Sequence, residues 1–486
     1  MGRDYAAVRE QKPPPRFIGF SVFVFRFSFF QFFRISIFGF PSFSPFTLLF
    51  PVFRFPSFHF PHFDPARIHC QKGILMTQFK DQRKSVTPMY AVVTACFWAS
   101  FCVCVSYAGE YLSKQLGYTA SEYGPIMAVG SLLGAIIAPL IGTVSDKYRR
   151  LTPLKLALPL FAAQILCLAV ILIYSGAGKC LANTAAFTLF IAVSIPVNTV
   201  NLKMDVDLER AGGKLNYPLA RGCGSLGFVV ISTVLGLMMD APQFGYISVP
   251  VGGLILILCE IPVHLWADRR LKALRAAGEK GGDSDAESAV ESASSLPMFA
   301  KQNGRFCLML LGTVLIFVAH NLDCNFLTEI NNALGGDSTS MGLLSAFTAV
   351  VEVPVMIFFI PVFGKMREST LIRFSLAMFV VKILAYALAP SIPVLFVARL
   401  LQAPSYALYT AAIVPYVSKV IAPRDANKGQ SLAFTMTTVG SIVANICGGV
   451  MYDNLGKTYT LLIGAGICLV GAVLAILGTQ TVSDNR

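Results

Sequence analysis

Glu352 is the one charged residue in the stretch AFTAVVEVPVMIFF, residues 346–359, with six uncharged residues before it and seven after it. At the centre of a lipid bilayer such a charge costs roughly 2.5 to 3.5 kcal/mol, so it should face water or a partner. A carboxyl group in that position can bind a polar ligand or carry a proton. Pro354 loosens the local backbone hydrogen bonding and suits a helix that moves. The alternative is a protonated structural glutamate packed against a neighbour.

Three further ionisable residues lie inside apolar segments. Lys382 occurs in FVVKILAYAL, Arg399 in VARLLQAPSYAL and Asp323 in AHNLDCNF. A buried lysine must pair with an acid or lose its proton, and Glu352 is one candidate partner for Lys382. His320 lies one turn before Asp323 and is interpreted as a structural histidine in preference to a proton relay.

The elements that must position these residues are membrane helices. Hydrophobic residues make up 55% of the 486 residues and charged residues 13%, a composition typical of membrane proteins. Apolar runs of about 20 residues, the length that crosses a bilayer, alternate with short polar turns, and an open sheet cannot satisfy its backbone in lipid. The sequence predicts an all-α membrane protein with twelve transmembrane helices, near 89–111, 123–145, 154–175, 181–202, 219–239, 244–267, 305–329, 341–364, 371–390, 392–417, 429–451 and 458–478.

The distribution of Lys and Arg predicts the orientation, because these residues accumulate in cytoplasmic loops. The loops on one side carry little beyond Lys114, Lys179 and Lys457. The basic residues after the second and sixth predicted helices are Lys147, Arg149, Arg150, Lys155, Arg269, Arg270, Lys272 and Arg275. Both termini are therefore expected in the cytoplasm of a multi-pass protein of the plasma membrane. This bias and the N-terminal arginines account for most of the net charge of +13, which is not interpreted as nucleic-acid binding.

The cysteines and histidines do not indicate catalysis. Nearly all of the twelve cysteines lie within predicted spans, without a CxxC pair, and are interpreted as small buried hydrophobes. An enzyme would need a nucleophile with its base, or clustered metal ligands, at the membrane face. Only five histidines occur, and those at positions 59, 62, 69 and 264 lie outside mid-span. We therefore expect no enzyme, no metal and no cofactor.

Residues 1–75 form a Phe-rich, low-complexity segment that holds 19 of the 39 Phe. It is not expected to be a membrane helix, because its Phe-rich run is interrupted by Arg16, Arg26, Arg34, Arg54, Pro41, Pro45, Pro51, Pro56 and Pro61. Phe, Ser, Pro and Leu are specified by pyrimidine-only codons, which favours a mis-assigned start with Met76 as the true one, leaving 486 − 75 = 411 residues. The alternative is a disordered extension with affinity for the membrane interface.

Two short echoes indicate an internal repeat. Pro139-Leu-Ile-Gly142 resembles Pro361-Val-Phe-Gly364 at an offset of 361 − 139 = 222, and Gly236-Leu-Met-Met-Asp240 resembles Gly449-Val-Met-Tyr-Asp453 at an offset of 449 − 236 = 213. Both link helices six apart, as expected of two six-helix bundles related by an axis along the membrane normal. The predicted organisation is a bundle in 76–268, a flexible cytoplasmic linker in 269–304 and a second bundle in 305–486.

These features resemble the major facilitator superfamily over nearly all of residues 80–480. The most specific match is GTVSDKYRR, residues 142–150, which is similar to the family's motif between the second and third helices. The resemblance implies a cytoplasmic gate, in which a small residue permits close helix approach and a charge cluster locks the face. Its residues are Gly142, Asp146, Lys147, Arg149 and Arg150. The alternative is a basic anchor of the cytoplasmic side.

Within the superfamily, YPLARGCGSLGF at 217–228 resembles the fifth helix of the lactose permease and nucleoside-proton symporter branch. The resemblance implies that Arg221 is a forked donor to the substrate and that Phe228 is an apolar platform. Asp205 or Asp207 could orient Arg221. The same stretch contains GxGxxG, but no βαβ unit surrounds it, so dinucleotide binding is rejected and the glycines are expected to permit close helix packing.

The branch also implies a role for the second bundle. Glu352 lies at the position of a substrate-binding glutamate, and Lys382 at that of an arginine near the proton site. The branch's proton-handling histidine and glutamate in the tenth helix correspond here to Gln402 and Ser405. Gln402 is therefore expected at the substrate, and proton coupling is assigned to Glu352 with Lys382.

Two more acidic residues are placed by the same fold. Asp323 and Arg399 are expected to pair, because the seventh and tenth helices both face the cavity in this fold. Glu260 in CEIPV lies in the sixth helix, which corresponds by the repeat to the twelfth, and it ranks below Glu352 as a site residue.

The resemblance implies a secondary transporter that works by alternating access. A small polar solute of sugar or nucleoside type would enter with protons, and the protein would act as a monomer in the lipid bilayer, with no nucleic-acid partner. One alternative is efflux of amphipathic compounds by antiport. Another is a non-transporting receptor on the same fold, which would bind its ligand without taking it up.

Overall fold

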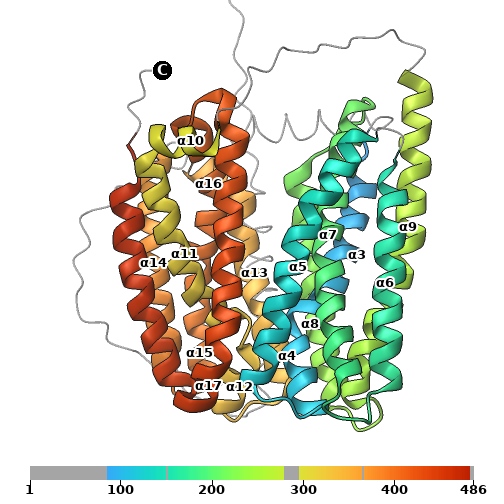
Figure 1. The fold of residues 1–486 in the computed structure, drawn as a ribbon, viewed down its shortest axis with the longest axis vertical. Helices are drawn as coiled ribbons and strands as arrows, with labels where there is room; N and C mark the ends of the chain where they lie inside the picture. Colours follow the sequence, from blue (N-terminus) through green and yellow to red (C-terminus); the bar gives the residue numbers. More distant parts are fainter. Residues whose placement is uncertain (1–84, 149–150, 279–294, 364–365, 482–486) are drawn as a thin grey trace, which may run out of the picture. The chain divides into compact units, whose positions relative to one another are not determined.

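The computed structural model describes four stretches of the chain, residues 85–148, 151–278, 295–363 and 366–481. The Phe-rich segment predicted for residues 1–75, together with Arg149 and Arg150, lies outside them. Nearly all of the described residues are helical, in two groups of helices. The first group runs from blue to yellow-green in Figure 1 and the second from yellow to red.

The first group comprises α3 (Thr87–Ser106), α4 (Ala108–Glu110), η1 (Tyr111–Gln115), α5 (Ala120–Lys147), α6 (Pro153–Ile173), α7 (Leu181–Arg210), α8 (Tyr217–Asp240), η2 (Gly245–Ile247) and α9 (Ser248–Gly278). The second comprises α10 (Leu296–Gln302), α11 (Gly304–Cys324), α12 (Leu327–Ala333), α13 (Ser338–Phe363), α14 (Glu368–Leu388), α15 (Ile392–Arg399), η4 (Leu400–Gln402), η5 (Ala403–Ala407), α16 (Leu408–Val420), η6 (Pro423–Asp425) and α17 (Ala426–Gly478).

Eleven of the described helical segments are long and apolar enough to cross a membrane. The last of them, in α17, is broken at Gly456, whose φ of 68° is left-handed and lies outside the helical region. Glycine adopts that conformation without the steric cost of a Cβ. This segment therefore contains both of the last two predicted spans, 429–451 and 458–478. The prediction of an all-α membrane fold with twelve spans is confirmed.

Contacts between helices follow the predicted repeat. In the first group, α3 packs against α8 and α9, and α7 against α5 and α6. In the second group, α17 packs against α11 and α14. Across the groups, α8 meets α13 and α5 meets α17. These are the fifth helix with the eighth and the second with the eleventh, so the two contacts between bundles are equivalent under an exchange of halves.

Close approach of α8 to α3 depends on glycine. A Cβ at Gly224 would collide with Trp98, and a Cβ at Gly227 would collide with the backbone of Ala95. Gly222 faces open space. Two of the three glycines in the GxGxxG stretch thus serve helix packing in this all-helical surrounding.

The tenth predicted span, 392–417, departs from a regular helix. After Arg399 the chain tightens into η4, widens into η5 and becomes regular again only at Leu408. Pro404 lies in this segment, and it cannot donate a backbone hydrogen bond. Tight and wide turns of this kind change the helical register and are frequent at functional sites. Arg399 and Gln402 are thereby turned to a common region.

The segment predicted as a linker, 269–304, is partly helical. The last helix of the first bundle, α9, continues to Gly278, and α10 covers Leu296–Gln302. Arg275 Nη2 at this extension of α9 lies 3.1 Å from Asp207 Oδ2 of α7, which ties the extension to its own bundle.

Candidate functional site

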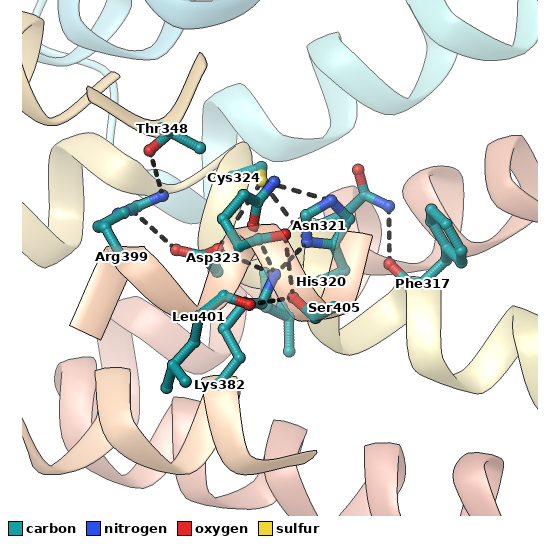
Figure 2. Close-up of polar contacts among 12 residues, drawn as sticks. Phe317, His320, Asn321, Asp323, Cys324, Thr348, Lys382, Arg399, Leu401 and Ser405 are labelled. Carbon is teal, nitrogen blue, oxygen red and sulfur yellow. Dashed lines mark hydrogen bonds and ion pairs between the residues drawn. The ribbon is translucent and has the colours of Figure 1, made fainter. Parts of the chain in front are cut away.

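A buried charge cluster, formed by Asp323, Lys382 and Arg399, lies between α11, α14 and α15 (Figure 2). Arg399 Nη2 donates to Asp323 Oδ1 at 2.9 Å, and Lys382 Nζ lies 3.8 Å from Asp323 Oδ2. All three residues are at most 1% exposed. The structure brings the predicted pair of Asp323 and Arg399 together, and it adds Lys382 to the same acid. Such burial is tolerable only because the charges are paired and hydrogen-bonded.

Gln402 connects this cluster to Glu352. The Gln402 Nε2 amide donates to Glu352 Oε1 at 2.8 Å, and its Oε1 accepts from Lys382 Nζ at 3.2 Å. Glu352 and Lys382, considered above as direct partners, are therefore linked through hydrogen bonds to the Gln402 side chain. An amide suits this place because it offers a donor and an acceptor at once.

His320 belongs to the same cluster, although the sequence favoured a purely structural role. Lys382 Nζ lies 2.6 Å from His320 Nδ1, so the ammonium donates to a neutral imidazole. The ring stacks on Tyr406, with centroids 4.8 Å apart. The spacing of His320 and Asp323 by three residues places both on one helix face, and that signal could have found the contact.

His320, Asp323 and Cys324 present three potential ligand atoms within 4.8 Å of one another. Lys382 Nζ, however, already lies beside both His320 and Asp323. A metal cation at this place would be repelled by the ammonium, which itself supplies the positive charge that the acid needs. The arrangement fits a buried ion-pair network and does not fit a metal centre.

Arg221 on α8 belongs to the other bundle. Its guanidinium lies over the Trp98 ring of α3, 3.9 Å from the centroid, and its Nη1 donates to Ser225 Oγ at 3.2 Å. The described residues give its other N–H groups no hydrogen-bond partner. Its helix, α8, packs against α13, which carries Glu352. Trp98 was missed from the sequence, where it is one tryptophan in an apolar run.

The acidic partner expected for Arg221 is not found among the described ion pairs. Asp207 pairs with Arg275 and with Lys203 instead. Asp205 forms no ion pair with Arg221, and its Oδ1 is buried without a hydrogen-bond partner in the described part of the chain. The Trp98 ring and a serine hydroxyl orient Arg221 in its place.

Phe228 lies seven residues after Arg221, two turns further along α8. It is partly buried and packs against a hydrophobic cluster that contains residues of both bundles. This position is compatible with an apolar platform at the edge of that cluster.

The predicted cytoplasmic gate lies at the end of α5. Gly142 faces open space, and the exposed Lys147 places its Nζ 5.6 Å from the Tyr148 ring. The side chain of Asp146 and all of Arg149 and Arg150 lie outside the described part of the chain. The charge cluster expected here stays a prediction.

Comparison with known proteins gives a consistent result. The sequence profile of the MFS_1 like family matches residues 89–463. The maltose permease of Geobacillus stearothermophilus is 23% identical over 407 residues, which cover 81% of this chain and 94% of that protein.

Solved structures agree with the fold. A mutant of the nucleoside transporter NupG matches with a TM-score of 0.64 at 16% identity, over 81% of this chain and 98% of that one. An auto inhibited peptide transporter of the POT family matches with a TM-score of 0.60 at 11% identity, over 82% and 98%. At these identities the structures are evidence for the fold alone.

Proposed function

The chain belongs to the MFS_1 like family of major facilitator transporters, and we propose that it imports a small polar solute of sugar or nucleoside type together with protons. The protein alternates access between the two sides of the membrane as a monomer. In this proposal the basic loops and both termini are cytoplasmic. The bundles predicted for residues 76–268 and 305–486 move against each other.

The observation that carries the proposal is the position of Glu352 between two kinds of partner. Within its own bundle it is tied through Gln402 to the buried Lys382. Across to the other bundle its helix, α13, packs against α8, which carries Arg221. When ionised, a carboxyl group so placed can accept a hydrogen bond from a hydroxyl group of a solute. When neutral, it holds a proton.

Protonation of Glu352 changes what Arg221 can bind. An ionised Glu352 attracts the Arg221 guanidinium from the other bundle. A protonated Glu352 does not, and the N–H groups of Arg221 are then available to a solute. Binding of the proton then favours binding of the solute, and the reverse holds by linkage. This is the coupling that symport requires.

The solute class follows from the groups around Arg221. The guanidinium offers forked donors to oxygens, while Trp98 and Phe228 offer aromatic surface to a ring. A ring that carries several hydroxyl groups satisfies both. The maltose permease and the nucleoside transporter named above act, by their names, on molecules of this kind.

The test is uptake by proteoliposomes of a panel of labelled sugars and nucleosides, with and without an imposed pH gradient. Wild-type protein should accumulate at least one of them only with the gradient. Glu352→Gln keeps the shape and the hydrogen bond to Gln402 but cannot titrate, so it should abolish accumulation. Downhill exchange survives if Glu352 is mainly a proton carrier, and solute binding is lost if it is mainly a ligand.

Glu368→Gln is the matched control, because Glu368 pairs with Lys419 at the end of α14, away from the cluster. It should accumulate solute normally. Accumulation by Glu352→Gln at every pH would reduce Glu352 to a structural residue. Binding without uptake would indicate a receptor, and proton-driven expulsion would indicate an efflux antiporter.

A further inference from the structure

The two bundles are hydrogen-bonded to each other at one end, called here the closed end. Asp453 of α17 accepts the backbone N–H groups of Ala120 and Ser121 at 3.1 and 2.8 Å, which caps the start of α5 in the other bundle. Asp240 of α8 accepts those of Ser338 and Thr339 at 3.3 and 2.6 Å, which caps the start of α13. A carboxylate suits the N-terminus of a helix, where the backbone N–H groups lack partners.

These two caps are the repeat detected in the sequence. Asp240 ends the stretch that begins at Gly236, and Asp453 ends the one that begins at Gly449. A Cβ at Gly236 would collide with α13 and a Cβ at Gly449 with α5. In each case a glycine permits the contact between bundles and an aspartate four residues later fixes it.

A second pair of acids joins the bundles between the caps. Glu110 of α4 accepts from Ser338 Oγ at 2.9 Å, and Glu329 of α12 accepts from Tyr123 Oη at 3.2 Å. Each glutamate thus binds a hydroxyl group of the opposite bundle. Unlike the aspartates, neither glutamate accepts a hydrogen bond from a backbone N–H group at the start of a helix among the described residues.

Glu110 is the more deeply buried of the two, at 1% exposure. Its Oε2 has no hydrogen-bond partner among the described residues. The hydroxyl of Thr328 lies close enough to act on Glu110, and it also contacts Met341 Sδ at 3.9 Å. A bare carboxylate oxygen in this position is costly, whereas a carboxylic acid carries its proton there at little cost.

The charges near Glu110 act in both directions, since Lys114 favours its ionised form and Asp240 opposes it. No ion pair reaches Glu110 or Glu329 in the part of the chain that the structure describes. Burial raises the pKa of the Glu329 carboxyl against the effect of the Tyr123 hydroxyl, and the charge of Asp453 raises it further while that of Lys114 lowers it. The titratable groups that face the two glutamates from the packed elements are Lys114 of η1, Tyr123 of α5, Asp240 of α8, Tyr246 of η2 and Asp453 of α17.

We propose that the closed end is a proton-binding site, at which Glu110 takes up a proton when the bundles meet and releases it when they separate. The inference rests on the alternating access proposed above and on the proposed cytoplasmic position of the basic loops, which puts this end on the outer side of the membrane. Separation would hydrate Glu110 and stabilise its ionised form, so closure is favoured at low pH and lost as the pH rises. The proton enters and leaves on the same side, and the site therefore senses outer pH and does not carry the proton across.

The test measures hydrogen exchange by mass spectrometry at the starts of α5 and α13, using the full chain in lipid nanodiscs at a series of pH values. The capped N–H groups of Ala120, Ser121, Ser338 and Thr339 are protected only while the end is closed. After correction for intrinsic exchange, wild-type protection should fall as the pH rises. The total fall should be about tenfold for each unit of difference between the pKa of Glu110 in the closed and in the open protein. Glu110→Gln should stay protected throughout the series.

Glu260→Gln is the matched control. Glu260 is also 1% exposed, accepts from the single hydroxyl of Ser100 and leaves Oε2 without a described partner, but both residues lie in one bundle. It should keep the wild-type pH response. If Glu110→Gln folds poorly, Ser338→Ala removes the hydroxyl that binds Glu110 and should move the midpoint of the response.

Protection of the wild type that does not change with pH would overturn the proposal, and so would a wild-type response in Glu110→Gln. No solute is added in this experiment. If none of the sugars and nucleosides is taken up, the proposed substrate class is wrong. The hydrogen-exchange result would still test the proton-binding site at the closed end.

Discussion

The two bundles bury polar groups in different ways. In the second bundle, Asp323, Lys382 and Arg399 carry full charges that must balance one another. In the first, Glu260 accepts from a serine, and His264 Nε2 lies 2.9 Å from Asn201 Oδ1, without an ion pair to either residue among those described. Hydrogen bonds between neutral groups, as around Glu260 and His264 in the first bundle, need no balancing charge. The charge cluster of the second bundle, in contrast, responds to every proton gained or lost. The comparison places the buried charge cluster in the second bundle, where the proposed function puts proton coupling, and leaves Arg221 as the principal charge that the first bundle offers a solute.

The largest effect is expected from Asp323→Asn. It leaves Lys382 and Arg399 buried without a negative partner, and breaking a buried pair in this way costs about 3 to 5 kcal/mol. Thermal unfolding in detergent should show a strong loss of stability, together with loss of transport. Glu260→Gln, the buried acid of the first bundle, should cost much less, because no cation depends on it. Equal losses in the two variants would remove the distinction between the bundles.

The sequence predicted the helices well because each span is a long apolar run with its own ends. It also found Glu352, Lys382, Asp323 and Arg399, because a charge in such a run is conspicuous. The break in the tenth span was not predicted, since Pro404 marks a disturbance without saying which way the chain turns afterwards.

Contacts between helices were harder to predict than the helices themselves. Neutral residues such as Gln402 and Trp98 occur throughout membrane spans, and only the packing of α3 on α8 or of η4 beside α13 reveals what they touch. The expected pairing of Asp205 with Arg221 illustrates the same difficulty. Both residues are correctly placed near helix ends, but the side chain that meets the guanidinium comes from a helix more than a hundred residues earlier.

A smaller and more selective effect is expected from Gln402→Leu. The change leaves Glu352 and Lys382 without the amide that joins them, and each unsatisfied buried group costs about 1 to 3 kcal/mol. Uphill accumulation should be lost while binding of solute in equilibrium measurements is weakened less.

Gln164→Leu tests the equivalent change in the first bundle. Gln164 Nε2 donates to Ser194 Oγ at 2.9 Å, and that hydroxyl keeps its own bond to the Phe190 carbonyl. The variant should lose some thermal stability and retain the ratio of accumulation to exchange. Loss of coupling in Gln164→Leu would show that the first bundle also handles protons.

The smallest effect is expected at Glu329, which lies at the contact between the bundles and accepts from Tyr123 Oη of the other bundle. Its pKa is raised above its ordinary value near 4.5, chiefly by burial. Below that ordinary value the group is protonated in both the folded and the unfolded chain, and above the raised value it is ionised in both. Between the two, the folded chain holds the proton more tightly, so rising pH lowers the free energy of unfolding. Glu329→Gln should reduce this slope in a series of melting temperatures measured against pH, leaving the part that comes from Glu110, and it should leave the accumulation ratio near that of the wild type. Glu368→Gln provides the reference, because Glu368 is partly exposed and paired with Lys419. If the melting temperature depends on pH in the same way in Glu329→Gln and in the wild type, Glu329 stays hydrated at the contact between the bundles. Its burial at the closed end would then not affect stability.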